Sequence, residues 1–372
     1  MPENIVLDPE VRAQYDAVHN DMGYFDRSNV GKLAIFGADR FSWLQGMVSN
    51  DVTSMRHKSS YGYFQACVLD ATGHLLTDLA LVPVRTIQGS IPFVKELRLP
   101  DEEFFIADLP RENVAKIRAI FERFIIMEDV EVRDVSDALG CFSYQGPVAS
   151  NGWENNFPYE RDPLAGLRRS NYIYPADYTG IYGSSGAIGF NVYFPAILRD
   201  EALSAAQFAN VPEIGMIAQE ILRIEAGIPK YGADMDETNI ALEANLGPTH
   251  ISMNKGCYVG QEIIARIDSR GHTNRSLTGL VFQKGCIPAV GDTIIAVEAD
   301  GTQKETGRIT SVCAISPAMQ DRPIALGYVR REHSESHARL TVGAKALAAE
   351  IVPLPFFKQP PLRFSPKHIP EK

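Results

Sequence analysis

Apolar residues recur with two different periods along the first part of the chain. Residues 31–36 form an apolar run (GKLAIF) that predicts a buried strand, and residues 40–48 place apolar side chains at helical spacing, which predicts a short helix. Residues 130–135 (VEVRDV) alternate apolar and charged side chains, as a half-buried strand does. Because both periods occur in one stretch, the pattern favours an α+β fold.

A β-hairpin is predicted over residues 61–83. Two apolar runs, at 63–69 and 75–82, flank residues 70–73 (DATG), whose composition is typical of a tight turn between paired strands. The hairpin would therefore place these two runs side by side in a sheet.

Two further helices are predicted from their apolar faces and their end signals. Residues 113–124 begin at Asn113, a residue type suited to the N-cap. Residues 211–225 carry Pro212 in the first turn, where its missing N–H costs little. This second helix is expected to end at Gly227, since glycine readily adopts the left-handed conformation that closes a helix.

The C-terminal quarter differs from the rest. From residue 277 to about 354 the chain consists of short strand patterns separated by Gly, Pro and Asp turns, which predicts a small all-β domain. The expected organisation is two interleaved α+β subdomains in 1–276, a β-barrel domain in 277–356 and an extended tail in 357–372. Residues 151–177, rich in Gly, Pro, Asn and aromatic residues, are predicted to form a long loop.

Charge and hydropathy limit which binding partners and which cellular location are expected. The 372 residues include 36 basic and 46 acidic side chains, a formal net charge of −10, so no nucleic-acid partner is expected. The first residues carry acids and lack an apolar core, which argues against a targeting peptide. No run approaches ~18 apolar residues, so no membrane association is expected, and a cytoplasmic location is predicted.

The five cysteines argue for a reducing compartment. They are odd in number and contain no CxxC pair, which disfavours a disulfide framework, a structural zinc site or a cluster held by neighbouring thiolates. No metal site is predicted. The cysteines are Cys67, Cys141, Cys257, Cys286 and Cys313.

Residues 255–262 (KGCYVGQE) form the sharpest local motif. Gly256 and Gly260 bracket Cys257, and a helical pattern follows directly, so backbone N–H groups and the helix dipole would favour a thiolate or a bound anion there. Lys255 would add a nearby positive charge. A glycine-rich turn around a buried, inert cysteine fits the same spacing, and both interpretations stay open.

Asp78 is a lone carboxylate within an otherwise apolar strand pattern. Such a group is costly to bury unless it is hydrogen-bonded or has a task, such as accepting a proton or holding an amine. The alternative is a surface-facing side chain on the polar side of the strand, which the spacing alone favours.

Arg223 lies in the last turn of the helix predicted over residues 211–225. A cation there complements the helix dipole, which is a sufficient structural reason for it. A guanidinium could equally bind a ligand carboxylate in bidentate fashion. The same two interpretations, structural and ligand-binding, apply to Lys230 a few residues later. For Lys230 a solvent-exposed side chain without a ligand is the simpler interpretation.

Several motifs together resemble the glycine cleavage T-protein superfamily along nearly the whole chain. They keep the order and approximate spacing of that family. The matching segments are DRS at 26–28 with GK at 31–32, LQG at 44–46 with SNDV at 49–52, RIEAG at 223–227 with YGAD at 231–234, GRITS at 307–311 with SP at 316–317, and IALGYV at 324–329.

The resemblance implies three domains around a central channel that holds tetrahydrofolate, with a C-terminal β-barrel. It implies that Asp78 faces the reactive nitrogens of the folate and that Arg223 pairs with its glutamate carboxylates. On this basis Cys257 and Asp78 are the expected catalytic residues. The expected cofactor-binding residues are Asp78, Arg223, Lys255, Gly256, Tyr258, Gly260, Gln261 and Glu262.

Two departures bear on the branch of the family. Aminomethyltransferases carry an acidic, glycine-rich stretch that grips the pteridine, whereas residues 186–191 (GAIGFN) have no acid. The motif at 255–262 resembles the hallmark of YgfZ-type proteins, folate-dependent helpers of iron–sulfur cluster assembly or repair. An aspartate at position 78, in contrast, is a feature that resembles the transferases.

The expected function is therefore tetrahydrofolate binding in support of iron–sulfur enzymes, with Cys257 as the essential residue and iron–sulfur client or assembly proteins as partners. One alternative is an aminomethyltransferase or demethylase that moves a one-carbon unit onto tetrahydrofolate. A catalytically silent scaffold that binds only another protein is a third interpretation.

Overall fold

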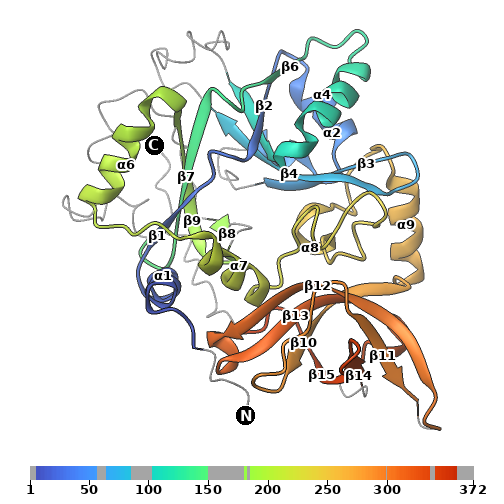
Figure 1. Ribbon diagram of the computed structural model, residues 1–372. Helices are drawn as coiled ribbons and strands as arrows, with labels where there is room; N and C mark the ends of the chain where they lie inside the picture. The colour runs from blue at the N-terminus through green and yellow to red at the C-terminus, as the bar shows by residue number, and fades with distance from the viewer. Residues whose placement is uncertain are drawn as a thin grey trace, which may run out of the picture.

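The computed structural model describes residues 6–56, 64–84, 103–149, 180–181, 185–298, 300–335 and 340–357. In these residues it forms two open sheets, a closed barrel and several helices (Figure 1). The helices are α1 (Pro9–Asn20), α2 (Arg40–Met47), α4 (Val114–Arg123), α6 (Arg199–Phe208), α7 (Met216–Glu225), α8 (Gly247–His250) and α9 (Gln261–Arg270).

The strands belong to three sheets. The five-stranded sheet contains β2 (Gly31–Phe36), β3 (Phe64–Leu69), β4 (Leu75–Val84), β5 (Phe104–Leu109) and β6 (Glu131–Asp134). The four-stranded sheet contains β1 (Gly23–Asp26), β7 (Leu139–Gln145), β8 (Gly180–Ile181) and β9 (Ile188–Pro195). The barrel contains β10 (Arg275–Phe282), β11 (Thr293–Val297), β12 (Gln303–Ser316), β13 (Arg322–Arg330), β14 (Leu340–Val342) and β15 (Leu347–Val352).

The predicted hairpin is confirmed as β3 and β4 of the five-stranded sheet, whose order is β3-β4-β5-β2-β6. Its turn closes where Gly73 N–H donates to the carbonyl of Asp70 at 3.0 Å. Gly73 has φ +79°, a conformation that favours glycine, and an added Cβ would lie 2.8 Å from Cβ of Ile263 on α9. The turn of the hairpin therefore packs closely against α9.

The two faces of the five-stranded sheet are covered differently. Helices α2 and α4 cover one face, where Trp43 meets Phe121 edge to face with ring centroids 5.1 Å apart. The other face packs against Cys141 and Tyr193 of the four-stranded sheet. Small residues of α6 cover the outer face of that second sheet, since Ala202 packs there with other buried alanines. The result is a layered α+β body, as the mixed periods predict.

The C-terminal residues form a closed six-stranded barrel, with strand order β10-β13-β12-β11-β14-β15, which confirms the predicted all-β domain. Its first strand begins at Arg275, close to the predicted start at residue 277. Helices α1 and α7 pack against the outside of β10 and β13 through one apolar cluster. The barrel lies at the bottom of Figure 1, with the segment around α8 between it and the five-stranded sheet.

One helix boundary and one helix cap differ from the prediction. The helix expected over 211–225 begins only at Met216, because the carbonyl of Pro212 accepts from Tyr24 N–H at 3.0 Å and holds that segment extended beside β1. Asn113 does not cap α4 with its side chain; its amide donates to Thr77 Oγ1 at 3.1 Å instead. The loop at 151–177, residues 61–63 of the hairpin and most of the tail lie outside the described residues.

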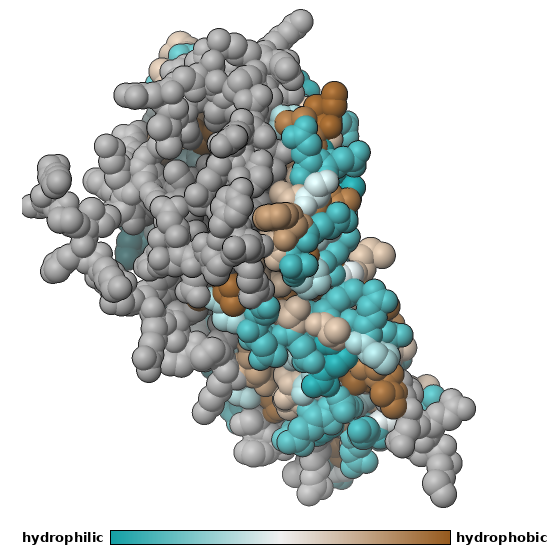
Figure 2. Space-filling model, turned by 90° about the vertical axis from the view of Figure 1, so that its left-hand side faces the viewer, coloured by the Kyte–Doolittle hydropathy of each residue, from teal (hydrophilic) through white to brown (hydrophobic). Residues whose placement is uncertain are grey.

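Among the helices of the described residues, none has the length and apolar character needed to cross a bilayer. On the face drawn in Figure 2, the coloured residues are mainly hydrophilic and the hydrophobic ones are scattered.

Candidate functional site

A cavity of about 370 Å³ lies between the five-stranded sheet and the C-terminal end of α7. This volume falls in the range of small-molecule sites, roughly 300–1,000 Å³. Its wall is rich in ionisable and amide side chains from segments far apart in the sequence. The residues that carry the argument below are Arg27, Gln65, Asp78, Asp108, Arg223 and His250.

Strand register brings the polar residues of the sheet together. Gln65 on β3 lies opposite Ala80 on β4, Ala80 lies opposite Asp108 on β5, and Asp108 lies opposite Lys32 on β2. Because side chains two residues apart point to the same face of a strand, Asp78 shares this face with Ala80. The face is apolar toward its other end, and Gln65, Asp78 and Asp108 line the cavity.

Asp78 presents a carboxylate oxygen with no partner. Its Oδ1 is inaccessible to solvent and accepts no hydrogen bond from the described residues. Burial raises the pKa of Asp78 to about 6. Asp78 is half-buried and lines the cavity, so it does not point to open solvent on the polar side of the strand, and its Oδ1 is a buried acceptor on the cavity wall. Such unsatisfied groups in native structures are uncommon and call for an explanation.

Asp108 is a second carboxylate on the same wall, and it was not anticipated from the sequence. It is buried, and its Oδ2 accepts from the hydroxyl of Tyr193 at 2.7 Å and lies 3.9 Å from the guanidinium of Arg27. Its Oδ1 accepts no hydrogen bond from the described residues. The signal that identified Asp78, a lone acid in an apolar strand, also fits Asp108 in FFIADL.

Lys32 lies beneath these acids and is fully buried. Its Nζ donates to the carbonyls of Arg27, Ser28 and Val30 at 2.8–3.3 Å, and burial lowers the pKa of its ammonium. These bonds pin the segment between β1 and β2, which supplies Arg27 to the cavity. The lysine thus supports the site without facing it.

Arg223 reaches the same cavity, but its guanidinium is fully engaged. It donates to Asp234 Oδ2 at 2.7 Å, to the Ile228 carbonyl at 2.7 Å and to Ser311 Oγ at 2.8 Å. It also pairs with Glu220 at 2.9 Å. A ligand carboxylate would have to displace Glu220, the half-exposed partner. Direct binding of folate carboxylates by Arg223 stays a prediction, and the observed role is to join α7 to the barrel.

His250 also lines the cavity and is uncharged at neutral pH. It is buried, and burial lowers the pKa of its imidazole to about 4. Its Nδ1 lies 2.7 Å from Thr249 Oγ1. The site therefore combines two carboxylates, a neutral imidazole and a flanking arginine, an arrangement that can hold an uncharged ring bearing N–H donors.

The motif at 255–262 docks on the segment after α2. Lys255 Nζ donates to the carbonyls of Gln45, Val48 and Asn50 at 2.7, 2.5 and 2.9 Å, which satisfies the end of α2. The ammonium also lies 4.8 Å from the ring of Tyr258. Lys255 therefore serves a structural bond network, and burial lowers its pKa to about 8. The prediction that it adds charge beside Cys257 is not supported by these contacts.

Position 260 of this motif requires a glycine for two reasons. Its φ is +83°, and an added Cβ would lie 2.5 Å from the carbonyl oxygen of Asp70 in the hairpin turn. Gly256, in contrast, has open space around it. Gln261 begins α9 and accepts from Tyr258 N–H at 3.2 Å, while Glu262 in the first turn is exposed.

Cys257 is exposed at the surface of this loop, which excludes the buried-cysteine interpretation. The residues that line the cavity at Asp78 include no member of the 255–262 motif. The two expected catalytic residues are therefore not brought into one site. Within the described ranges, no three metal-ligating side chains cluster, so the predicted absence of a metal site stays a prediction for the chain as a whole.

Comparison with known proteins gives consistent results along the chain. Residues 275–358 match the family of the glycine cleavage T-protein C-terminal barrel domain. An aminomethyltransferase of Halalkalibacterium halodurans is 24% identical over 361 residues, which cover 94% of this chain and 90% of the relative. One from Listeria monocytogenes serotype 4b is 26% identical over 360 residues, with the same coverage.

The fold agrees with that of a solved relative. The crystal structure of glycine cleavage system aminomethyltransferase T from Bartonella henselae superposes with a TM-score of 0.70 at 18% identity, over 93% of this chain and 89% of the other. The expected α+β fold with a C-terminal barrel is thereby confirmed. At this identity the likeness concerns the fold alone.

Proposed function

We propose that this protein belongs to the glycine cleavage T-protein superfamily and transfers a one-carbon unit to tetrahydrofolate in the cavity lined by Asp78. The observation that carries the proposal is the buried, unpartnered oxygen of Asp78 on the wall of that cavity. The names of the full-length relatives favour this function over the iron–sulfur role expected from the motif at 255–262.

The residues present fit a reduced pterin. Its ring edge carries N–H donors, and the cavity offers two buried carboxylate oxygens, on Asp78 and Asp108, that accept no hydrogen bond from the described residues. Bound tetrahydrofolate would supply the nitrogen that takes up the one-carbon unit. Asp108, held by Tyr193, would fix the ring, and Arg27 beside it would balance the charge.

Asp78 would act as the proton acceptor. Its pKa of about 6 leaves it largely ionised at neutral pH, yet close enough to neutrality to take and release a proton. A carboxylate in this position also stabilises positive charge that develops on a neighbouring nitrogen. The neutral His250 adds no competing charge to this wall.

The first test is titration of the wild-type protein with tetrahydrofolate in a calorimeter, followed by a transfer assay. We expect saturable heat of binding, and formation of methylene- or methyl-tetrahydrofolate from lipoyl-bound or free amine donors. Binding without product from any donor would contradict the transferase function while leaving the folate site intact. Absence of any heat would contradict both and would favour the scaffold interpretation.

A second candidate function rests on Cys257. Its thiol is exposed on a loop held by the Lys255 bonds, which suits a reactive or recognition residue in iron–sulfur maintenance. A single thiol does not hold a cluster alone, so this role would need a thiolate from a client or assembly protein.

Replacing Cys257 with Ser separates the two functions. Because the thiol lies outside the Asp78 cavity, we expect the variant to keep transfer activity within about twofold of wild type. Iron–sulfur enzyme activities in a strain lacking the native gene would fall only if the second candidate is right. The matched control is Cys286→Ser, a partly buried thiol on the barrel. Loss of transfer in Cys257→Ser alone would contradict the separation of the two sites.

A further inference from the structure

Tyr193 lies behind the wall of the Asp78 cavity. It belongs to β9 of the four-stranded sheet, is fully buried, and packs in the cluster that joins the two open sheets. The residues that line the cavity do not include it. Its phenol nevertheless contacts the wall, because the hydroxyl donates to Asp108 Oδ2 at 2.7 Å.

A second hydrogen bond gives this contact a direction. Asn191 lies two residues earlier on the same face of β9 and donates from Nδ2 to the Tyr193 hydroxyl at 3.3 Å. A phenol carries one proton, and Tyr193 gives that proton to Asp108, so its oxygen can only accept from Asn191. The three side chains therefore form a one-way chain from amide to phenol to carboxylate. Hydrogen bonds in such a chain polarise and strengthen one another.

The orientation of the Asn191 amide follows from this chain. Because Nδ2 faces Tyr193, the amide oxygen Oδ1 is directed elsewhere, where it is buried and accepts no hydrogen bond within the described ranges. Turning the amide over would set two acceptor oxygens against each other. Asn191 is the last residue of the acid-free stretch at 186–191. An ionised acid at this position would have no proton to donate and would compete with Asp108 for the proton of Tyr193.

Asp108 is bonded at one oxygen only. Its Oδ2 accepts from Tyr193 and lies 3.9 Å from the guanidinium of Arg27, while Oδ1 accepts no hydrogen bond from the described residues. Rotation about the last side-chain bond of an aspartate exchanges its two oxygens, and the bond from Tyr193 opposes that rotation. Oδ1 is therefore the acceptor that Asp108 keeps available on the cavity wall.

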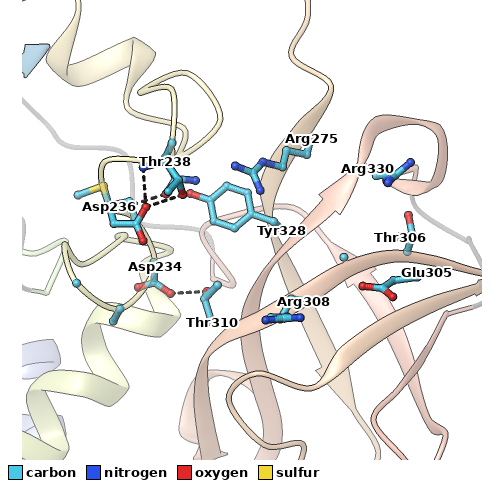
Figure 3. Close-up of a pocket in the computed structure, with 15 residues that line it drawn as sticks. Asp234, Asp236, Thr238, Arg275, Glu305, Thr306, Arg308, Thr310, Tyr328 and Arg330 are labelled. Carbon is cyan, nitrogen blue, oxygen red and sulfur yellow. Dashed lines mark hydrogen bonds between the residues drawn. The ribbon is translucent and has the colours of Figure 1, made fainter. Parts of the chain in front are cut away.

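The buried carboxylate of Asp234 provides a contrast. It lies in a second cavity, of about 790 Å³ beside the barrel, where Figure 3 shows its bond to Thr310. Both of its oxygens are occupied, since Oδ1 accepts from Thr310 and Ser311 and Oδ2 accepts from Arg223. A carboxylate bonded at both oxygens fits a structural role. Asp108, bonded at one oxygen, has an acceptor to offer a ligand.

We propose that Asn191 and Tyr193 are positioning residues that hold Asp108 so that its Oδ1 accepts N–H donors from the edge of a ligand ring. The inference rests on the proposed function and adds the groups that set the selectivity of the ring site. Asp108 recognises the ring, and Asp78 stays available to take the proton. The ligand class is a flat ring whose edge bears N–H groups, because an edge with acceptors alone would be repelled by the Asp108 oxygen.

Tyr193→Phe tests the middle of the chain while keeping the packing of the ring. In calorimetric titration with tetrahydrofolate we expect the Kd to rise about tenfold, the loss of one charge-assisted hydrogen bond. The KM for tetrahydrofolate should rise with it, while kcat at saturation stays within about twofold of wild type. The midpoint of the pH–rate profile near 6, which belongs to Asp78, should not move.

The matched control is Tyr144→Phe. Tyr144 is an equally buried tyrosine of the same sheet, but it packs in the cluster under α6 and not in the cluster between the two sheets. Removing its hydroxyl should leave the Kd for tetrahydrofolate unchanged. A rise in Kd equal to that of Tyr193→Phe would show a general effect of the sheet and would overturn the positioning role.

Two variants at position 191 test the direction of the chain. Asn191→Leu removes the donor to Tyr193 without adding an acceptor, so the Kd should rise by about two- to threefold. Asn191→Asp also competes for the proton of Tyr193, so its Kd should rise further. Tighter binding in Asn191→Asp would overturn the chain, because residue 191 would then meet the ring directly. If Asn191→Asp does not fold, Asn191→Leu and Tyr193→Phe decide the question.

A double-mutant cycle separates positioning from packing. If Tyr193 acts through Asp108, Tyr193→Phe should change the Kd little once Asp108→Ala has removed the acceptor, since residues that act together are not additive. Equal Kd values in wild type and Tyr193→Phe, or full additivity with Asp108→Ala, would overturn the proposal and leave the folate site intact. Absence of heat in the wild type would contradict the folate site itself, and this inference with it.

Discussion

Asp78→Asn is expected to remove transfer activity while stabilising the protein at neutral pH. The amide cannot accept the proton that the carboxylate takes, so we expect the transfer rate to fall by about 10²–10⁴-fold, the usual contribution of a general base. In wild type the rate should rise with pH through about 6, where Asp78 ionises. A stopped transfer assay with saturating donor measures both effects.

The stability effect follows from the direction of the pKa shift. The folded pKa of about 6 lies above the ordinary value of 3.8, so the stability linked to Asp78 is fully present below about pH 4 and is lost as pH rises through 6. This shift corresponds to at most about 3 kcal/mol. Asn does not ionise, so the variant should gain in Tm over wild type at pH 7–8 but not at pH 4–5.

Asp70→Asn is the matched control on the same hairpin. Asp70 accepts hydrogen bonds from Thr72 and His74 in the turn, and it lies outside the cavity, so this variant should lose stability and keep transfer. The proposal for Asp78 fails if Asp78→Asn transfers within a few-fold of wild type, or if its Tm advantage does not grow with pH.

Arg223→Met is expected to lower the free energy of unfolding by about 3–5 kcal/mol, because it leaves the carboxylate of Asp234 buried without its cation. Asp234 is 2% exposed and also accepts from Thr310 and Ser311 of the barrel. The ion pair between Arg223 and Asp234 therefore links α7 to β12. Urea unfolding followed by circular dichroism measures the loss.

Two controls separate this structural role from ligand binding. Glu220→Gln removes only the half-exposed partner of Arg223 and should change stability by less than about 0.5 kcal/mol. Arg223→Met/Asp234→Leu removes both buried charges and should recover much of the stability. If Arg223→Met instead keeps wild-type stability but binds tetrahydrofolate more weakly, the original prediction of a folate-carboxylate partner is right.

Glu225, two residues further along α7, is a second buried side chain that links this helix to its neighbours. Its carboxylate accepts from Tyr15 on α1 at 2.8 Å, and from Ser316 at 2.5 Å and Ala318 N–H at 3.1 Å at the barrel. The RIEAG motif thus places two buried charges that hold α1, α7 and the barrel together. These bonds give the motif a structural role between the layers, and the ligand role of Arg223 stays a prediction.

Local pattern was sufficient to predict much of the architecture. The hairpin of β3 and β4, helix α2 and the C-terminal all-β domain all follow from period and turn composition, because these are short-range properties of the chain. The same holds for Asp78: an acid in an apolar strand is anomalous wherever the strand lies. Asp108 carries that signal too and could have been found.

Tertiary structure alone decided what surrounds these residues. Register across four strands brings Gln65, Asp108 and Lys32 into one row, and no local signal specifies register between strands that are distant in sequence. For Arg223 and Lys255 the sequence determined the charge but not the partner. Their structural partners, Asp234 and the carbonyls at the C-terminal end of α2, come from other segments, so local pattern could not specify these bonds. Ligand binding by either residue stays a prediction.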